Sequence, residues 1–131
     1  MRVRTVDVNY ELNIIPDTRI ALFRWSGLIT LKERKKNVEV VAQFCRENGI
    51  SQLIVDTRKQ VSETTTMEMY HFGAAIPKVM SGIQIAVVCR QSDRDTQFAE
   101  TVAADRGAES HSVKTVEDAK KWLAGVEVTL N

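Results

Sequence analysis

The sequence predicts an α/β domain with a central mixed sheet of five strands and about four helices, in the order β-β-α-β-α-β-α-β-α. Short apolar stretches rich in β-branched residues alternate along the chain with segments in which apolar residues recur at helical spacing. Strands that alternate with helices need crossover connections, so most of the sheet should be parallel. We expect the 131 residues to form a single domain with a core over about residues 8–125.

The first two strands should form an antiparallel hairpin. Apolar and polar residues alternate over residues 8–14, as in a strand with one buried face. Turn-forming residues follow at 16–18, and a second strand is expected over residues 19–25, closed by Gly27.

Three later stretches should complete the sheet. Residues 53–55 and 83–89 are short and apolar, as in strands buried on both faces, and we expect 83–89 to lie inside the sheet. Residues 109–113 predict a weaker strand at the edge. A polar loop is expected over residues 57–63.

Helix starts are marked by Thr30, Thr65 and Thr115, each of which precedes an acidic residue by three positions, the spacing of a capping box. The expected helices run from Thr30 to Gly49, from Thr65 to an end or kink at Pro77, around residues 98–103 with a stop at Gly107, and from Thr115 onward. Gly73 should let the second helix approach the sheet closely.

Charge and composition exclude several classes of protein. The net charge is +1 and the sequence pI is 7.8, whereas nucleic-acid-binding domains usually exceed a pI of about 9. The basic segment Lys32–Lys36 therefore predicts a solvated helix face. Residues 83–89, the longest uncharged apolar stretch, fall short of the roughly 18–20 residues of a membrane span. No apolar segment follows the basic N-terminus, so we expect no signal peptide.

Nucleophilic and metal-binding residues are few and scattered. Cys45 and Cys89 fall in apolar segments and predict buried thiols, which fits a reducing cytoplasm. His71 and His111 have no partner at metal-ligand spacing. Four carboxylates stand where helix N-termini favour negative charge: Asp93, Asp95, Glu117 and Asp118. We therefore expect a non-enzymatic protein that needs no cofactor and no metal.

Four hydroxyl residues gather at the expected start of the second helix: Ser62, Thr64, Thr65 and Thr66. They follow the strand that ends at Asp56, and ligands of open α/β sheets bind beyond the carboxyl ends of strands. The cluster can bind a phosphate or be phosphorylated. The alternative is a purely structural role, because Ser and Thr are the common residues of caps and loops.

The C-terminal part carries a resemblance to a known family. Residues 97–100, the Asp105-Arg106-Gly107 turn and the closing helix over residues 116–123 resemble the SpoIIAA-like branch of the STAS domains, the bacterial anti-sigma-factor antagonists. The resemblance covers about residues 8–125 and rests on packing motifs, so it implies the fold more strongly than an activity.

This resemblance implies a regulatory module that binds a protein partner. In signalling members a kinase phosphorylates a hydroxyl in an Asp-Ser-Ser-Gly or Asp-Ser-Thr-Gly motif at the start of the second helix. Counted from Asp56, the motif falls on Thr64-Thr65-Thr66-Met67. Its hydroxyls are present, but its leading Asp and closing Gly are not.

A rival hypothesis is a carrier of small apolar ligands, because the Sec14-type lipid carriers resemble this branch. The residues expected to line such a pocket are Met67, Met69, Phe72, Ile76 and Met80. Such a stripe is also typical of an ordinary helix core. Apolar and polar residues alternate over residues 126–130, so this tail either frays or pairs with a second chain, and a homodimer and a monomer both stay open.

Overall fold

The sheet and helices follow the predicted order. The computed structural model describes residues 5–6 and 9–128. The strands are β1 (Thr5–Val6), β2 (Tyr10–Ile14), β3 (Ile20–Ile29), β4 (Gln52–Ser62), β5 (Gln84–Val88) and β6 (Ser110–Val113). The helices are α1 (Leu31–Glu47), α2 (Thr66–Val79), α3 (Arg94–Asp105) and α4 (Val116–Leu123). All five predicted strands and all four predicted helices are therefore confirmed.

The sheet is mixed, as predicted. Its strands lie in the order β1-β2-β3-β4-β5-β6, with β1, β2 and β3 antiparallel and β3 to β6 parallel. The strand β1, only two residues long, extends the predicted hairpin at its outer edge. The most apolar strand, β5, is inside the sheet and β6 is at its edge, as expected.

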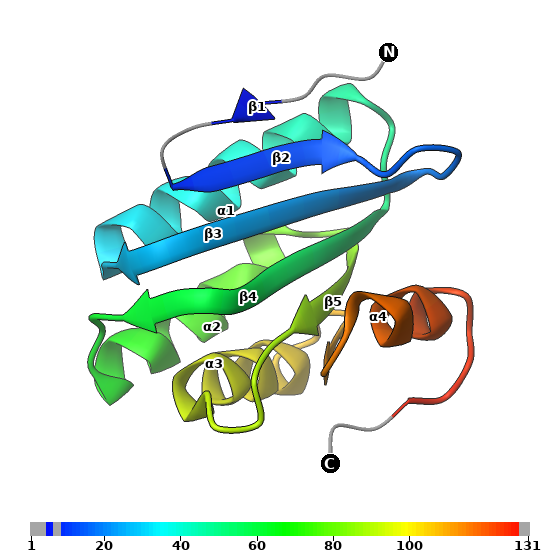
Figure 1. The fold of residues 1–131 in the computed structure, drawn as a ribbon. Helices are drawn as coiled ribbons and strands as arrows, with labels where there is room; N and C mark the ends of the chain where they lie inside the picture. Colours follow the sequence, from blue (N-terminus) through cyan, green and yellow to red (C-terminus); the bar gives the residue numbers. More distant parts are fainter. Residues whose placement is uncertain (1–4, 7–8, 129–131) are drawn as a thin grey trace.

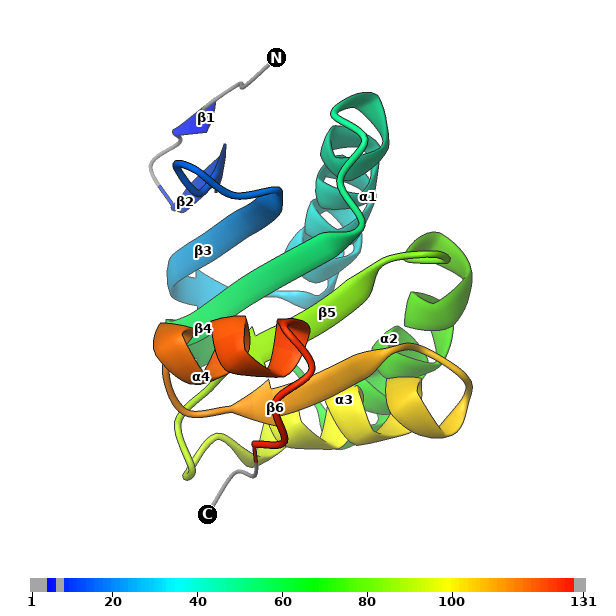
Figure 2. The same ribbon diagram turned by 90° about the vertical axis from the view of Figure 1, so that its right-hand side faces the viewer.

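The helices cover the two faces of the sheet unequally. Figures 1 and 2 show α1, α2 and α3 on one face and α4 alone on the other. The larger core lies between the sheet and the three helices and includes Phe23, Trp25, Val41, Phe44, Leu53 and Ile85. The smaller core lies under α4 and includes Leu22, Ile54, Val88, Val113, Ala119 and Leu123. Successive strand residues point to opposite faces, so neighbours such as Leu53 and Ile54 serve different cores.

Two strands are longer than predicted. Gly27 does not close β3, and β4 runs through the segment that was expected to be a loop. A bulge after Arg24 shifts the register, and the parallel pairing then continues to the pair Ile29–Ser62. Since β5 stops opposite Asp56, the extension has only two strands, and of its β4 residues only Thr57 and Gln60 are buried. Polar residues are therefore tolerated there, and the sequence looks like a loop.

Three of the helix starts follow the predicted capping chemistry. Thr30 and Thr65 each form a complete capping box, and the Thr115 side chain accepts a hydrogen bond from Asp118 N. The third helix begins earlier than expected, because the Asp93 carboxylate caps it by accepting from Thr96 N. α2 continues past Pro77 to Val79, so the expected helix end at this proline was wrong, whereas the expected kink stays a prediction. The proline lies in the last turn, so only Lys78 and Val79 continue the helix beyond it.

Gly73 is a point of close approach between two helices. A Cβ atom placed there would lie 2.4 Å from the carbonyl oxygen of Ala99 on α3. The prediction that Gly73 faces the sheet was therefore wrong, because its neighbour is α3. Because glycine has no side chain, the backbones of α2 and α3 can pack directly against each other at this point.

The end of the described chain turns back over the sheet. Residues 126–128 form no strand, and the Val128 carbonyl contacts the His111 ring on β6. The remaining residues of the expected C-terminal strand, 129 and 130, lie outside the described residues, as does Val8 of the expected first strand. Within the described part of the chain, no helix has the length and apolar character needed to span a bilayer.

Candidate functional site

A cavity of about 110 Å³ lies between the sheet and the helices α1, α2 and α3, and it is partly open to solvent. Its floor is formed by side chains of the sheet, among them Phe23, Val55 and Val87. All three helices contribute to its walls. Most of the lining is apolar, with a few polar side chains among it, which suits a small, partly apolar ligand.

Four of the five predicted pocket residues line this cavity. Met69 and Met80 are buried there, and Phe72 and Ile76 are half-buried at its wall. Met67 is not part of it: this side chain is 64% exposed in the first turn of α2 and points away from the core. The predicted stripe on one helix face therefore begins at Met69, because Met67 lies on the solvent side of the helix.

Arg34 corrects the view of the basic segment as a solvated face. Lys32, Lys35 and Lys36 are exposed, but the Arg34 side chain is only 5% exposed and lines the cavity. Its Nε donates to Thr64 Oγ1 at 3.2 Å, and its guanidinium lies 6.0 Å from the centroid of the Phe72 ring. Burial lowers the pKa of Arg34, and the nearby charges of α3 act in the opposite direction.

Sequence reasoning missed Arg34 although a signal was present. Leu31, Arg34, Val38 and Val41 follow one another at the spacing of a single helix face, so Arg34 lies within the apolar stripe of α1. A charged residue in such a stripe is informative, because buried arginines are rare unless they are paired. Because Arg34 is flanked by lysines, the whole segment was interpreted as a solvated basic face.

Two further polar residues of the cavity were also missed. Asn37, one turn after Arg34, is 8% exposed, and Gln60 on β4 is 5% exposed. Both line the cavity, together with Thr57, whose hydroxyl donates to the Val88 carbonyl. Gln60 could not be found from the sequence, because its segment looked like a loop.

The four predicted hydroxyl residues lie together where β4 ends and α2 begins, and we call this segment, residues 62–66, the hydroxyl corner. Ser62 and Thr64 are half-buried and their hydroxyl oxygens are 2.8 Å apart. The Thr65 hydroxyl accepts from Glu68 N as the N-cap of α2. Thr66 is exposed, and its hydroxyl has no hydrogen-bond partner among the described residues. The corner therefore holds hydroxyls in three different environments.

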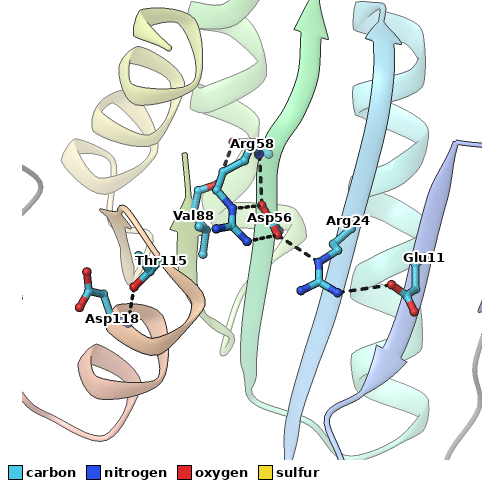
Figure 3. A network of polar contacts seen from close by, with 8 residues as sticks. Glu11, Arg24, Asp56, Arg58, Val88, Thr115 and Asp118 are labelled. Carbon is cyan, nitrogen blue, oxygen red and sulfur yellow. Dashed lines mark hydrogen bonds and ion pairs between the residues drawn. The ribbon is translucent and has the colours of Figure 1, made fainter. Parts of the chain in front are cut away.

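A second polar cluster lies on the opposite face of the sheet, beside α4. Figure 3 shows Asp56 between Arg58 on its own strand and Arg24 on β3, with Glu11 on β2 beyond Arg24. Arg24 Nε and Arg58 Nη2 lie 3.0 and 2.9 Å from Asp56 Oδ2. Burial alone would raise the pKa of Asp56, but the hydrogen bonds from Arg58 and Arg24 outweigh it and lower the pKa. Arg24 Nη1 also lies 3.5 Å from Glu11 Oε1, so these ion pairs join the strands β2, β3 and β4.

Both cysteines are buried, as predicted. Cys45 lies in the larger core and Cys89 directly follows β5, and neither forms a disulfide. Burial raises the pKa of each thiol to about 11. Thiolates are therefore scarce at neutral pH, which makes both side chains poor nucleophiles.

Comparisons with known proteins identify the fold. No family model and no curated protein matches the chain. The solved structure of the anti-sigma factor antagonist SpoIIAA in its unphosphorylated form matches with a TM-score of 0.56 and 11% identity, covering 89% of this chain and 99% of that one. An uncharacterized DUF3478 protein from Shewanella loihica with a SpoIIAA-like fold matches with a TM-score of 0.53 and 14% identity, covering 94% and 95%. The chain thus has the SpoIIAA-like fold that its sequence predicted.

Proposed function

We propose that the protein is a non-enzymatic regulatory module that binds a protein partner at the end of the molecule where β3 and β4 stop and α2 begins (Figure 1). The observation that carries the proposal is a set of exposed apolar side chains on the last residues of β3 and β4 and in the first turn of α2. Of the five large apolar side chains exposed in the described residues, three lie at this end: Leu28, Val61 and Met67. Leu28 and Val61 are partners in the parallel register and so lie side by side. Exposed apolar residues that gather in one place favour a binding surface.

The fold supports the same kind of function. SpoIIAA, with which the chain shares its fold, is an anti-sigma factor antagonist, and its matching structure is the unphosphorylated form. By analogy, phosphorylation at the hydroxyl corner would control partner binding here. Fold alone is a weak warrant for function, so the proposal depends on the exposed residues of this chain.

Thr66 is the acceptor that the geometry favours. The Thr65 hydroxyl is engaged as a helix cap, and the hydroxyls of Ser62 and Thr64 contact each other. Thr66 is exposed at the first position of α2, where the helix dipole stabilises a phosphate by roughly 0.3–1 kcal/mol. The added charge, about −2, would lie next to Met67 and oppose its desolvation by a partner.

The rival hypothesis, a lipid carrier of the Sec14 type, receives less support. The cavity of about 110 Å³ is smaller than the engineered cavity of about 150 Å³ that holds one benzene molecule. An acyl chain would therefore have to push α2 away from the sheet. A carrier of much smaller ligands remains compatible with this volume.

Affinity capture from the source organism tests the partner surface. The wild-type chain should retain a specific protein that Met67→Asp loses, because a charge would be desolvated in the contact. Phe98→Asp is the matched control, since Phe98 is also exposed, at 38%, but lies on α3. Equal capture by wild type and Met67→Asp would refute the surface.

The switch has its own test. Thr66→Asp should weaken binding to the captured partner, while Thr66→Ala should leave it intact. Intact mass spectrometry of the protein from its own host should find the added mass of one phosphate group, whereas a retained lipid would favour the carrier.

Light scattering with and without residues 126–131 separates a monomer from a dimer held by the tail. We also propose a cytoplasmic location, which the two buried, unpaired cysteines support.

A further inference from the structure

Arg34 is a buried cation without a paired anion. Its side chain is 5% exposed, and within the described part of the chain no carboxylate lies within ion-pair distance of it. One of its nitrogens, Nη2, has no hydrogen-bond partner at all. Buried charges in proteins are almost always paired, because their desolvation is costly. Asp93 and Asp95 attract the guanidinium only from a longer range.

Unpartnered polar atoms are concentrated around the same cavity. Besides Arg34 Nη2, they are Asn37 Nδ2 and Gln60 Oε1, and both of these residues also line it. Only one other buried atom in the described residues lacks a partner, Asn13 Oδ1 on β2. An unsatisfied buried polar group costs roughly 1–3 kcal/mol, so three of them around one cavity point to a ligand that supplies the missing partners.

The chemistry of these atoms defines the polar end of that ligand. Arg34 Nη2 and Asn37 Nδ2 are donors on the same face of α1, one turn apart. Two unpartnered donors one turn apart, one of them charged, match the two oxygens of a carboxylate. The Gln60 carboxamide can turn either its oxygen or its nitrogen toward a ligand, so it fits beside a carboxylate or a hydroxyl.

The rest of the cavity defines the other end. Met69, Phe72 and Ile76 of α2 line this end with apolar side chains, as does Val87 of the sheet. Glu100 of α3 also lines the cavity, but its carboxylate is already engaged, because it accepts hydrogen bonds from Ser110 and Ser112. The volume of about 110 Å³ is below the roughly 150 Å³ of a cavity that holds benzene, so it favours a short apolar body. Long acyl chains and bulky aromatic acids do not fit without a change in packing.

We propose that this cavity binds a small monocarboxylate with a short apolar body. The carboxylate accepts hydrogen bonds from Arg34 and Asn37, and the apolar body lies against Met69, Phe72 and Ile76. The inference does not depend on the partner surface at Met67, which lies outside the cavity, and either can fail without the other.

Methionine methyl resonances report on the site directly. With ¹³C-methyl methionine in the full chain, sodium butyrate should shift the signals of Met69 and Met80, which line the cavity, in a saturable manner. Met67 is the internal control, because it is 64% exposed and lies outside the cavity, so its signal should not move. Butanol and n-butylammonium, which have the same number of carbon atoms but no anion, should bind at least about tenfold more weakly, since a hydrogen bond to a charged group is worth about 1.5–3 kcal/mol.

Arg34→Met removes the charge at similar size, a change that is often neutral or stabilising for a buried ion. It should weaken butyrate binding about 10- to 100-fold and leave butanol binding intact. Lys35→Met is the matched control, because Lys35 is the exposed neighbour on α1, and it should bind butyrate like the wild type. If Arg34→Met does not fold, Asn37→Leu replaces it, with an expected loss of about 2- to 10-fold.

Three results would overturn the proposal. Equal shifts with butyrate and butanol would mean an apolar cavity without selectivity for an anion. No shift of Met69 or Met80 with butyrate would mean that water alone satisfies the polar atoms. Binding of dodecanoate but not of butyrate would mean that the cavity opens for long chains, as the carrier hypothesis requires.

Discussion

Asp56→Asn tests how the polar cluster beside α4 stabilises the sheet. Asp56 is 6% exposed and accepts four hydrogen bonds: one from Arg24 Nε, and three from Arg58, through N, Nε and Nη2. Asparagine keeps the shape of the side chain but removes the charge and one acceptor oxygen. The two arginines would then lose their common counter-ion.

The expected cost follows from the exposure of the partners. Breaking a fully buried ion pair costs about 3–5 kcal/mol, because the remaining charge has no water. Here the side chains of Arg24 and Arg58 are 43% and 39% exposed, so both can hydrate after the substitution. We therefore expect Asp56→Asn to lower the free energy of unfolding by about 1–3 kcal/mol near pH 7.

The effect should depend on pH with a definite sign. The folded pKa of Asp56 is lowered below its ordinary value, so its stabilisation is complete above the unfolded pKa of about 3.9 and disappears as the pH falls through the folded pKa. Urea unfolding followed by tryptophan fluorescence should show a constant difference between wild type and Asp56→Asn from about pH 7 to 5, and a shrinking difference below about pH 4.

Glu117→Gln is the control for this measurement. The Glu117 side chain is 78% exposed and lies 3.6 Å from Lys120, so its removal should change the free energy of unfolding by less than about 0.5 kcal/mol. The reasoning is refuted if Asp56→Asn is as stable as the wild type near neutral pH. It is equally refuted if the difference grows as the pH falls.

Three further predictions concern packing, capping and thiol reactivity. Gly73→Ala should gain about 0.5–1 kcal/mol in helix propensity but lose about 1–3 kcal/mol to the clash with Ala99, a net destabilisation in urea unfolding. Thr65→Ala should cost about 1 kcal/mol in the same assay, because α2 loses its cap, and Thr65→Ser should restore it. Cys45 and Cys89 should react with an aromatic disulfide reagent near pH 8 only after denaturation, because both thiols are buried with a pKa of about 11.

Each of these has a contrary outcome. A more stable Gly73→Ala protein would mean that α2 and α3 are farther apart than described. Full stability of Thr65→Ala would mean that the hydroxyl does not cap the helix. Rapid labelling of either thiol in the folded protein would mean that the core around it opens readily.

Local signals made most of the fold predictable. The apolar stretch around β5 and the capping residues Thr30, Thr65 and Thr115 depend on chemistry within a few residues, and each was found. The far ends of β3 and β4 were not predicted, because a strand pair without a third neighbour can carry many exposed polar residues. Its polar residues therefore match the composition of a loop.

The candidate site was only partly predictable for a related reason. Met69, Phe72 and Ile76 of α2 could be placed on one helix face by their spacing, whereas Met67 lies on the solvent side. The closeness of Arg34 to Thr64 and of Gly73 to Ala99 joins residues that are far apart in the chain, and no local pattern records it. The burial of Arg34 was visible as a charge within an apolar stripe, and that is the signal to use in similar sequences.

Hydrogen–deuterium exchange of the captured complex tests the central claim, that the partner binds where β3 and β4 end and α2 begins. The account predicts slower exchange in peptides that cover residues 26–30 and 61–68, because partner contact excludes water from Leu28, Val61 and Met67. Exchange in α4, which packs on Leu22, Ile54 and Val88 rather than on the far ends of β3 and β4, should stay unchanged. Protection confined to α4 and β6, with none at residues 61–68, would contradict the account.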